Sequence, residues 1–575
     1  MSFLSSSVRA AVGASLAAIT LAAAANTVSD TVAADALAQV LAGEIAQQRQ
    51  LLPQAWKNFM AAAKTTRDPQ LAERAWESAL ESRNPETAAL ALRLWRELAP
   101  EDPRTEIYSA AEGLLSSNAK TRADSETRLN KALARTEGPN LVIAKIMDLT
   151  ATAENKRAVY ESLNRLSAPY LKDYTPLEMM LAQNADNAGL KQEAVRHAEN
   201  ALNAAPDDLP LLMIGTDYLL HAKPQAATDH LKRFVSAHPE AAMARLSLAR
   251  SYLSTGTDED IERELAELNR RHGSDAEVVF AAGTIAEEAG LLDEAERAYK
   301  KFLVLIHRPG NKRLEPDDAY ARLGMVKLAR GDKIHAVEWF HKVEKGGRYL
   351  AVKLKEAQVL ADLGETDAAC TVLKNTRADA KQRGRLLLAV ADLYLQAGRA
   401  EEAYQAGRDA QTLLPNNPQT IYKGAQLAEH TQRFDEAEFL LRHYIVLRPN
   451  DANGHNALGY LWLEHDKNLS EAAQHIERAM ALSNGRDGFI TDSMGWLRFK
   501  EGRFEEAETY LRKAFQMQPD LDIALHLAEV LLVNGRTGDA ERLLNLVLKN
   551  APENPTAQRL HQRLQSLSRK QGGAP

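Results

Sequence analysis

The sequence predicts an all-α fold, a right-handed superhelical solenoid of about fifteen helical hairpins. Three marks recur in one register along the 575 residues. A small residue lies in the middle of one helix, and an acidic residue followed by alanine comes about twelve residues later. A proline often comes about twelve residues after that alanine. The clearest alanines are Ala472, Ala507 and Ala540, which lie 35 and 33 residues apart.

Each mark has a physical cause. Two helices can approach closely only where side chains are small, so Gly459 is expected to face Ala472. Proline ends the second helix because it lacks the N–H and clashes with the preceding turn. Gly502 and Gly535 suit the turn between helices, where a left-handed conformation is cheap for glycine. A two-helix repeat of about 34 residues is the tetratricopeptide pattern, and such hairpins must stack to bury their apolar faces.

The alanine of the second helix can be followed along the chain at intervals of 32 to 36 residues, with one interval of 41. Its expected positions are Ala55, Ala88, Ala123, Ala158, Ala194, Ala226, Ile261, Ala295, Ala336, Ala368, Ala403, Ala437, Ala472, Ala507 and Ala540. Proline recurs after the second helix at Pro100, Pro206, Pro415, Pro449, Pro519 and Pro552. We predict degenerate repeats over residues 26–180, regular repeats over 181–555, and a capping helix and tail over 556–575.

Two segments depart from the repeat. The interval of 41 residues contains HRPGNKRLEPDD, residues 307–318, which predicts an exposed loop. This loop is either a tolerated insertion or a contact loop on one edge of the solenoid. The first helix, expected over residues 35–50, carries Leu37, Val40, Leu41 and Ile45 near one stripe. It is either the N-terminal cap or a docking helix for another protein.

Residues 1–25 are predicted to be a secretory signal peptide. One basic residue, Arg9, precedes an apolar run that ends in Ala23, Ala24 and Ala25, which suits signal peptidase. The alternatives are an uncleaved membrane anchor or an alanine-rich helix. The one cysteine, Cys370, excludes a disulfide within the chain, and no cysteine follows the signal to carry a lipid anchor. We therefore expect a periplasmic protein.

No catalytic, cofactor or metal motif stands out from the repeat. Ser117 and Lys120 match S-x-x-K, but the companion motifs of that hydrolase class are absent. The histidines show no metal-binding spacing. A net charge of −7 argues against nucleic-acid binding. We expect neither enzyme activity nor a direct small-molecule substrate.

The remaining candidate is a protein-binding groove lined by the first helices of the C-terminal repeats. Aromatic rings supply contact area, and amides and carboxylates supply direction. The candidate residues are Asn453, Asn456, Tyr460, Asp492, Trp496 and Glu529, with Phe489 nearby. In the alternative interpretation, Tyr460 and Trp496 pack between neighbouring hairpins.

Several segments resemble a proteobacterial family of exported tetratricopeptide proteins. GEIAQQR and LRLWRELAPEDP look like its opening, and NALGYLWLEHDKNLSEAAQHIERA, DSMGWLRFKEGRFEEAETYLRKAF and HLAEVLLVNGRTGDAERLL look like its closing repeats. The resemblance extends from Ala36 to about Arg563. The family includes an outer-membrane lipoprotein that serves as adaptor of a periplasmic carboxy-terminal processing protease. That adaptor binds the serine protease and its substrates, which are peptidoglycan hydrolases.

The resemblance implies a non-catalytic periplasmic adaptor that binds such a protease and presents cell-wall hydrolases to it. One departure is the stretch ITLAAAANT, which lacks the lipobox cysteine of the adaptor type. A lipid anchor in the outer membrane is therefore not supported, and a peripheral association with that membrane stays open. The alternative function is a scaffold in an outer-membrane or exopolysaccharide assembly or secretion machine. An enzyme with an unrecognised site and a cytoplasmic regulator are weaker alternatives.

Overall fold

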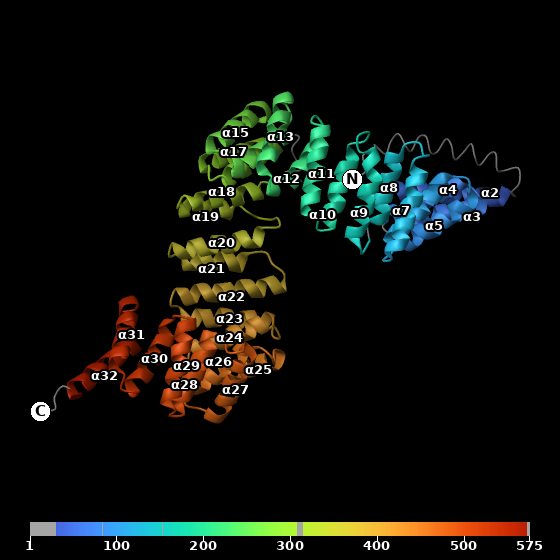
Figure 1. The fold of residues 1–575 in the computed structure, drawn as a ribbon. Helices are drawn as coiled ribbons and strands as arrows, with labels where there is room; N and C mark the ends of the chain where they lie inside the picture. Colours follow the sequence, from blue (N-terminus) through green and yellow to red (C-terminus); the bar gives the residue numbers. More distant parts are fainter. Residues whose placement is uncertain (1–29, 83, 152, 308–313, 572–575) are drawn as a thin grey trace. The chain divides into compact units, whose positions relative to one another are not determined.

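The computed structural model describes residues 30–571, except 83, 152 and 308–313. The described residues form 31 α-helices and no strand, which confirms the all-α prediction (Figure 1). Each helix packs mainly against the helices before and after it in the chain, as in a tetratricopeptide solenoid. Within the described residues, no helix combines the length and apolar character that a bilayer span requires. The chain divides into two compact units, one up to Leu305 and one from Ile306.

The first unit contains sixteen helices and two short 3₁₀ turns. The helices are α2 Asp30–Gln48, α3 Leu52–Thr66, α4 Pro69–Glu81, α5 Pro85–Leu98, α6 Pro103–Glu112, α7 Ala119–Leu133, α8 Pro139–Thr150, α9 Lys156–Ser167, α10 Pro176–Asn187, α11 Lys191–Ala204, α12 Leu209–Ala222, α13 Pro224–Ala237, α14 Ala242–Thr255, α15 Asp258–His272, α16 Ala276–Glu288 and α17 Leu292–Ile306. The turns are η1 Gly113–Leu115 and η2 Ala168–Tyr170.

The second unit contains fifteen helices. They are α18 Asp317–Ala329, α19 Lys333–His341, α20 Tyr349–Asp362, α21 Thr366–Asn375, α22 Ala380–Gln396, α23 Ala400–Leu413, α24 Pro418–His430, α25 Phe434–Leu447, α26 Ala452–Glu464, α27 Leu469–Ser483, α28 Gly488–Lys500, α29 Phe504–Met517, α30 Leu521–Val533, α31 Thr537–Asn550 and α32 Pro555–Gln571. In Figure 1 these helices follow one another in pairs through the unit.

The expected alanine positions fall on the second helix of successive pairs, from Ala55 on α3 to Ala540 on α31. Most of them are completely buried, which confirms that these positions face the partner helix. The register is wrong at four positions, Ala123, Ala158, Ala226 and Ala368. Ala123 and Ala368 are exposed, and Ala158 and Ala226 are only half-buried. The buried residues lie one or two positions later, at Ser125, Val159, Ala227 and Ala369.

The physical causes assigned to glycine and proline agree with the backbone. Gly502 and Gly535 adopt positive φ angles of 77° and 72° in their turns. Pro415, Pro449 and Pro519 each lie two residues beyond the last residue of the preceding helix. Proline therefore follows the end of the second helix, where the chain turns toward the next hairpin.

The two ends of the described chain differ. On α2, Val40 is buried whereas Leu37, Leu41 and Ile45 are 42%, 53% and 49% exposed. The apolar stripe predicted for this helix is therefore split between a packed face and an open face. On α32, Leu560 and Leu564 are buried in a cluster with α30 and α31, the packing expected of a capping helix.

Three expectations fall outside the described residues, wholly or in part. The predicted signal peptide, residues 1–25, lies outside them. So does the centre of the predicted insertion, residues 308–313, close to the division between the two units. The end of the predicted tail, residues 572–575, also lies outside.

Candidate functional site

The six candidate residues lie on the first helices of three consecutive hairpins in the second unit. These helices, α26, α28 and α30, pack directly against one another in that order. Helix α26 carries Asn453, Asn456 and Tyr460, α28 carries Asp492 and Trp496, and α30 carries Glu529. The repeat therefore brings together residues that are far apart in sequence.

Asp492 is buried and pairs with a histidine of the next hairpin. The residue is 5% exposed, and its Oδ1 and Oδ2 atoms lie 3.0 and 2.9 Å from Nδ1 of His526 on α30. The other ring nitrogen of His526, Nε2, lies 3.4 Å from the hydroxyl of Tyr460. His526 thus joins α26, α28 and α30, although the sequence pattern did not select it.

Trp496 packs between hairpins, as the alternative interpretation expected. The residue is 7% exposed, and its ring stacks on His526 with the centroids 4.3 Å apart. It also stacks on Phe499, 4.8 Å away. Its indole N–H donates to Oε1 of Glu464 at 2.8 Å. The ring is therefore a support for this face and offers little surface to a ligand.

Several carboxylates surround these rings. Burial raises the pKa of Tyr460, and the charges of Glu464, Asp492, Asp522 and Glu429 raise it further. Burial raises the pKa of Glu429, and the charge of Glu464 adds to that rise. These four acidic residues come from four consecutive first helices, α24, α26, α28 and α30.

We call this region the acidic aromatic face. It consists of Glu429, Tyr460, Glu464, Asp492, Trp496, Asp522 and His526. Glu464 and Asp522 are exposed, and Glu429, Tyr460 and His526 are half-buried. The face therefore presents carboxylates and part of Tyr460 to solvent, above a buried layer formed by Asp492 and Trp496.

Burial lowers the pKa of His526, but the hydrogen bond and charge of Asp492 outweigh burial, with support from Glu464 and Asp522. The net result is a raised pKa, which favours the imidazolium. The imidazolium neutralises part of the negative charge beneath the face. Its Nδ1–H donates to Asp492, so the buried carboxylate does not remain unpaired.

The other candidate residues lie at the margins of the face. Asn453 is exposed at the start of α26, where its backbone N–H donates to the Asp451 cap. Asn456 has a buried Oδ1 atom with no hydrogen-bond partner in the described part of the chain. Glu529 lies 3.9 Å from Arg559 and 3.6 Å from Arg563, both on α32. Glu529 therefore faces the C-terminal helix.

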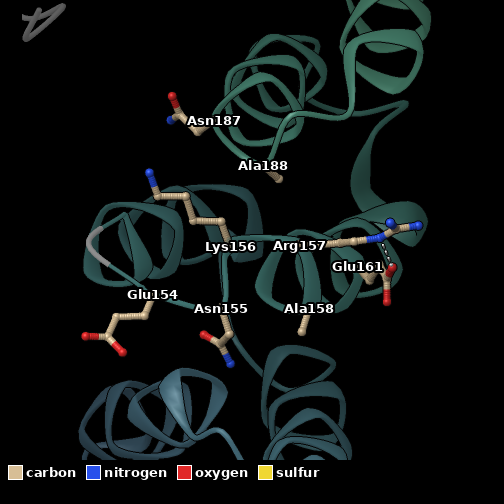
Figure 2. A pocket seen from close by; sticks show the side chains of 8 residues that line it. All are labelled: Glu154, Asn155, Lys156, Arg157, Ala158, Glu161, Asn187 and Ala188. Atoms are coloured by element: carbon tan, nitrogen blue, oxygen red, sulfur yellow. Dashed lines mark hydrogen bonds and ion pairs between the residues drawn. The ribbon is translucent and has the colours of Figure 1, made fainter. Parts of the chain in front are cut away.

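Two surface hollows lie elsewhere. The first, in the first unit, has a volume of about 530 Å³ and is lined by residues of the α9 N-terminus and the α10 C-terminus (Figure 2). Figure 2 shows Lys156 extending toward Asn187, and a dashed line between Arg157 and Glu161 marks an ion pair. The paired atoms of Arg157 and Glu161 are 3.3 Å apart. The second hollow, of about 480 Å³, lies between α20 and α22 and is lined by Leu354, Leu395 and Asp392 among others.

Neither hollow brings together a catalytic set. The hollow in the first unit is lined mostly by exposed charged and amide side chains. Among the residues that the structure describes, no group of three or more histidine, cysteine or acidic side chains could hold a metal ion. Among the described residues, the acidic aromatic face is therefore the candidate binding surface that we consider further.

Family models of tetratricopeptide repeats match three segments of the chain, residues 212–260, 354–418 and 498–564. A TPR repeat-containing protein of Pseudomonas aeruginosa, PA4667, is 31% identical over 214 residues, which cover 37% of this chain and 36% of that protein. A tetratricopeptide repeat-containing protein of Caenorhabditis elegans is 31% identical over 87 residues, 15% of this chain and 10% of its own. The chain thus spans about a third or less of the length of these two relatives.

Solved structures with similar repeats include a thermophilic TPR protein of Thermus thermophilus. It is 21% identical, has a TM-score of 0.29, and covers 32% of this chain and 97% of its own. A tetratricopeptide repeat protein of Parabacteroides merdae is 18% identical, has a TM-score of 0.32, and covers 45% of this chain and 99% of its own.

The helical hairpins and the matched segments define the class of this molecule. The described residues form an all-α solenoid with tetratricopeptide repeats in the matched segments, and solenoids of this kind offer extended surfaces that can bind other proteins. Tetratricopeptide proteins of this class are generally non-catalytic.

Proposed function

We propose that this protein is a periplasmic adaptor that binds a carboxy-terminal processing serine protease and presents peptidoglycan hydrolases to it. The coarse part of this proposal, a protein-binding scaffold, follows from the stacked hairpins and the matched repeat segments. The finer part is supported by the resemblance of the GEIAQQR and DSMGW segments to the adaptor family.

One observation carries the binding role. The acidic aromatic face leaves Glu464 and Asp522 exposed and Glu429 half-buried on neighbouring first helices. Burial and the charge of Glu464 raise the pKa of Glu429, so its ionised form lacks full compensation within this face. A protein partner can use such groups for directional contacts.

The adaptor would work by effective concentration. Two proteins bound to one scaffold meet as if they were parts of one molecule, and their encounter rate then depends on the geometry of the scaffold. A solenoid suits this task because it offers a long surface without requiring a deep pocket. The scaffold itself needs no catalytic residues, because the protease supplies the chemistry.

Affinity capture tests the proposal. The tagged chain is expressed in a proteobacterial host that encodes such a protease, recovered from a gently solubilised envelope, and its partners are identified by mass spectrometry. We expect a carboxy-terminal processing protease together with a cell-wall hydrolase. Recovery of a secretion or polysaccharide assembly machine without a protease would replace the proposal with that alternative scaffold. The mature N-terminus, read in the same sample, tests export, and retention of residues 1–25 would contradict cleavage of the predicted signal.

A further inference from the structure

Two histidines of one helical hairpin share a hydrogen bond. His455 lies near the start of α26 and His475 lies on α27, and their Nδ1 atoms are 2.8 Å apart. The other ring nitrogen of His455, Nε2, lies 3.1 Å from the carbonyl oxygen of Pro449, in the turn before α26. His455 is 9% exposed and His475 is half-buried. The pair therefore joins α27 to the beginning of α26.

These contacts assign the protons of the two rings. A carbonyl oxygen can only accept, so Nε2 of His455 carries a proton and donates to Pro449. In neutral His455, Nδ1 is then bare and accepts from the Nδ1–H of His475. A further proton on Nδ1 of His455 would set two N–H groups against each other and remove the hydrogen bond. While the rings stay together, the pair can hold at most one imidazolium, that of His475.

The surroundings disfavour this imidazolium as well. Burial has the largest effect on the pKa of His475, and the charges of His455 and Arg442 lower it further, against the opposite effect of Glu471. Arg442 lies on α25, where it pairs with Glu438 at 2.9 Å, and it is 3.5 Å from Glu471 on α27. Glu471 is thus shared with a cation and does not fully favour protonation of His475.

The other charged groups around the pair are engaged with partners of their own. These contacts are Arg478 of α27 with Asn450 at 3.0 Å, Arg498 of α28 with Glu477 at 2.9 Å, and Asp451 with the hydroxyl of Tyr444 on α25 at 2.7 Å. Among the described residues, neither His455 nor His475 has a hydrogen bond to a carboxylate. The pair therefore differs from His526, whose imidazolium is held by Asp492.

The sign of the pH effect follows from these proton counts. When α27 is released, both imidazoles are free to take up protons as the pH falls through the ordinary histidine value of 6.5. The closed pair takes up fewer protons, so its contribution to stability is present above this value and is lost as the pH falls below it. Each proton of difference changes the equilibrium between closed and open hairpin about tenfold per pH unit.

We propose that His455 and His475 form an acid-sensitive switch, which holds α27 against α26 at neutral pH and releases α27 at acidic pH. His475 can leave because its ring is already half-buried and next to solvent. Its departure would also uncover Trp462, whose buried ring lies 5.5 Å from that of His475. The inference goes beyond the proposed function, because the switch acts on the hairpin itself whatever partner the scaffold binds.

Hydrogen exchange of the full chain, measured by mass spectrometry at pH 7 and pH 5 and corrected for the intrinsic effect of pH on exchange, tests the switch. We expect protection of α27 to fall about tenfold or more between these two pH values. Protection of α24 and α25 should change much less. This measurement uses the native chain, so it does not depend on how a variant folds.

His475→Gln tests the cause of the release. The glutamine amide can still donate to Nδ1 of His455, but it takes up no proton. At pH 5, α27 should therefore keep most of the protection that it has at pH 7. His430→Gln is the matched control, since it removes an exposed imidazole from α24 in the same unit. This control should lose as much protection as the native chain.

Equal protection of α27 at both pH values in the native chain would overturn the inference. An equal loss in the native chain and in His475→Gln would also overturn it, because the release would then come from other groups. If His475→Gln is unprotected already at pH 7, His455→Gln takes its place, since its amide can accept from His475 and donate to Pro449. Affinity capture at pH 7 reports on the proposed function separately, so the adaptor can fail while the switch stands.

Discussion

At the scale of single residues, Asp492 and His526 depend on each other. Asp492 is 5% exposed, and a buried carboxylate is unfavourable unless a cation or hydrogen-bond donor compensates it. The imidazolium of His526 supplies a positive charge and a hydrogen-bond donor, with its Nδ1 atom 2.9 Å from Oδ2 of Asp492. The ring of His526 lies between those of Trp496 and Tyr460. Together with Tyr460, this pair therefore links three consecutive first helices beneath the acidic aromatic face.

Asp492→Asn tests this dependence. Without the charge of Asp492, the effect of burial should dominate and the pKa of His526 should fall. A histidine with a raised folded pKa adds stability below its ordinary value of 6.5, and this contribution is lost as the pH rises through the folded pKa. We therefore expect the variant to lose about 1–3 kcal/mol of unfolding free energy near pH 6, and less at higher pH.

Unfolding monitored by circular dichroism across this pH range measures the effect, and an NMR titration of His526 reports its pKa. Asp435→Asn is the control, because the side chain of Asp435 is 97% exposed. The control should show little change at any pH. A penalty for Asp492→Asn that is the same at every pH would mean that the pair makes no contribution through titration.

At the scale of the helical hairpin, close approach depends on a missing side chain. A Cβ atom added at Gly459 on α26 would lie 2.7 Å from Cγ1 of Ile476 and 3.0 Å from the carbonyl oxygen of Ala472. Ala472 and Ile476 are both on α27 and completely buried. The two helices cannot separate without exposing that core, so the contact requires glycine.

Gly459→Ala should therefore destabilise the protein by about 1–3 kcal/mol, although alanine is the better helix former. Gly538→Ala is the matched control, since a Cβ atom there would meet nothing within 4 Å. The control should leave stability unchanged or raise it by up to about 1 kcal/mol. Chemical denaturation compares the two, and equal effects would show that α26 and α27 are not in close contact at Gly459.

The sequence predicted the helical hairpins well because small residues, turn glycines and prolines act locally. It failed where the local signal is ambiguous. At Ala226 and Ala368 the next residue is also alanine, and only packing decides which one faces the partner helix. Beside Ala123, the close approach is made by Ser125, whose side chain lies against Gly113.

The candidate site was harder to predict, because its contacts cross hairpins. The side chain of His526 reaches Asp492, 34 residues earlier, and Tyr460, 66 residues earlier. Periodicity places residues on a helix face but does not say how far a side chain reaches. A polar residue two positions before the mid-helix alanine, as in His526 before Ala528, was the available signal.

At the scale of the whole molecule, neighbouring hairpins are linked by ion pairs near their turns. Arg399 pairs with Asp367 at 2.7 Å, and Arg433 pairs with Glu401 at 3.0 Å, in each case 32 residues apart. Each exposed pair contributes only about 0–1 kcal/mol, so the buried faces between hairpins supply most of the stability. A stack held by neighbour contacts keeps the surfaces of successive hairpins in order along the chain, which the proposed adaptor function would require.

The proposed function is to hold a protease and its substrate together. Degradation of the captured hydrolase by the captured protease, measured while the purified protein is titrated, tests it most directly. We predict that the rate rises with added protein, passes through a maximum and then falls, because excess scaffold binds the two partners separately. A degradation rate that does not change with the amount of added protein would contradict the account.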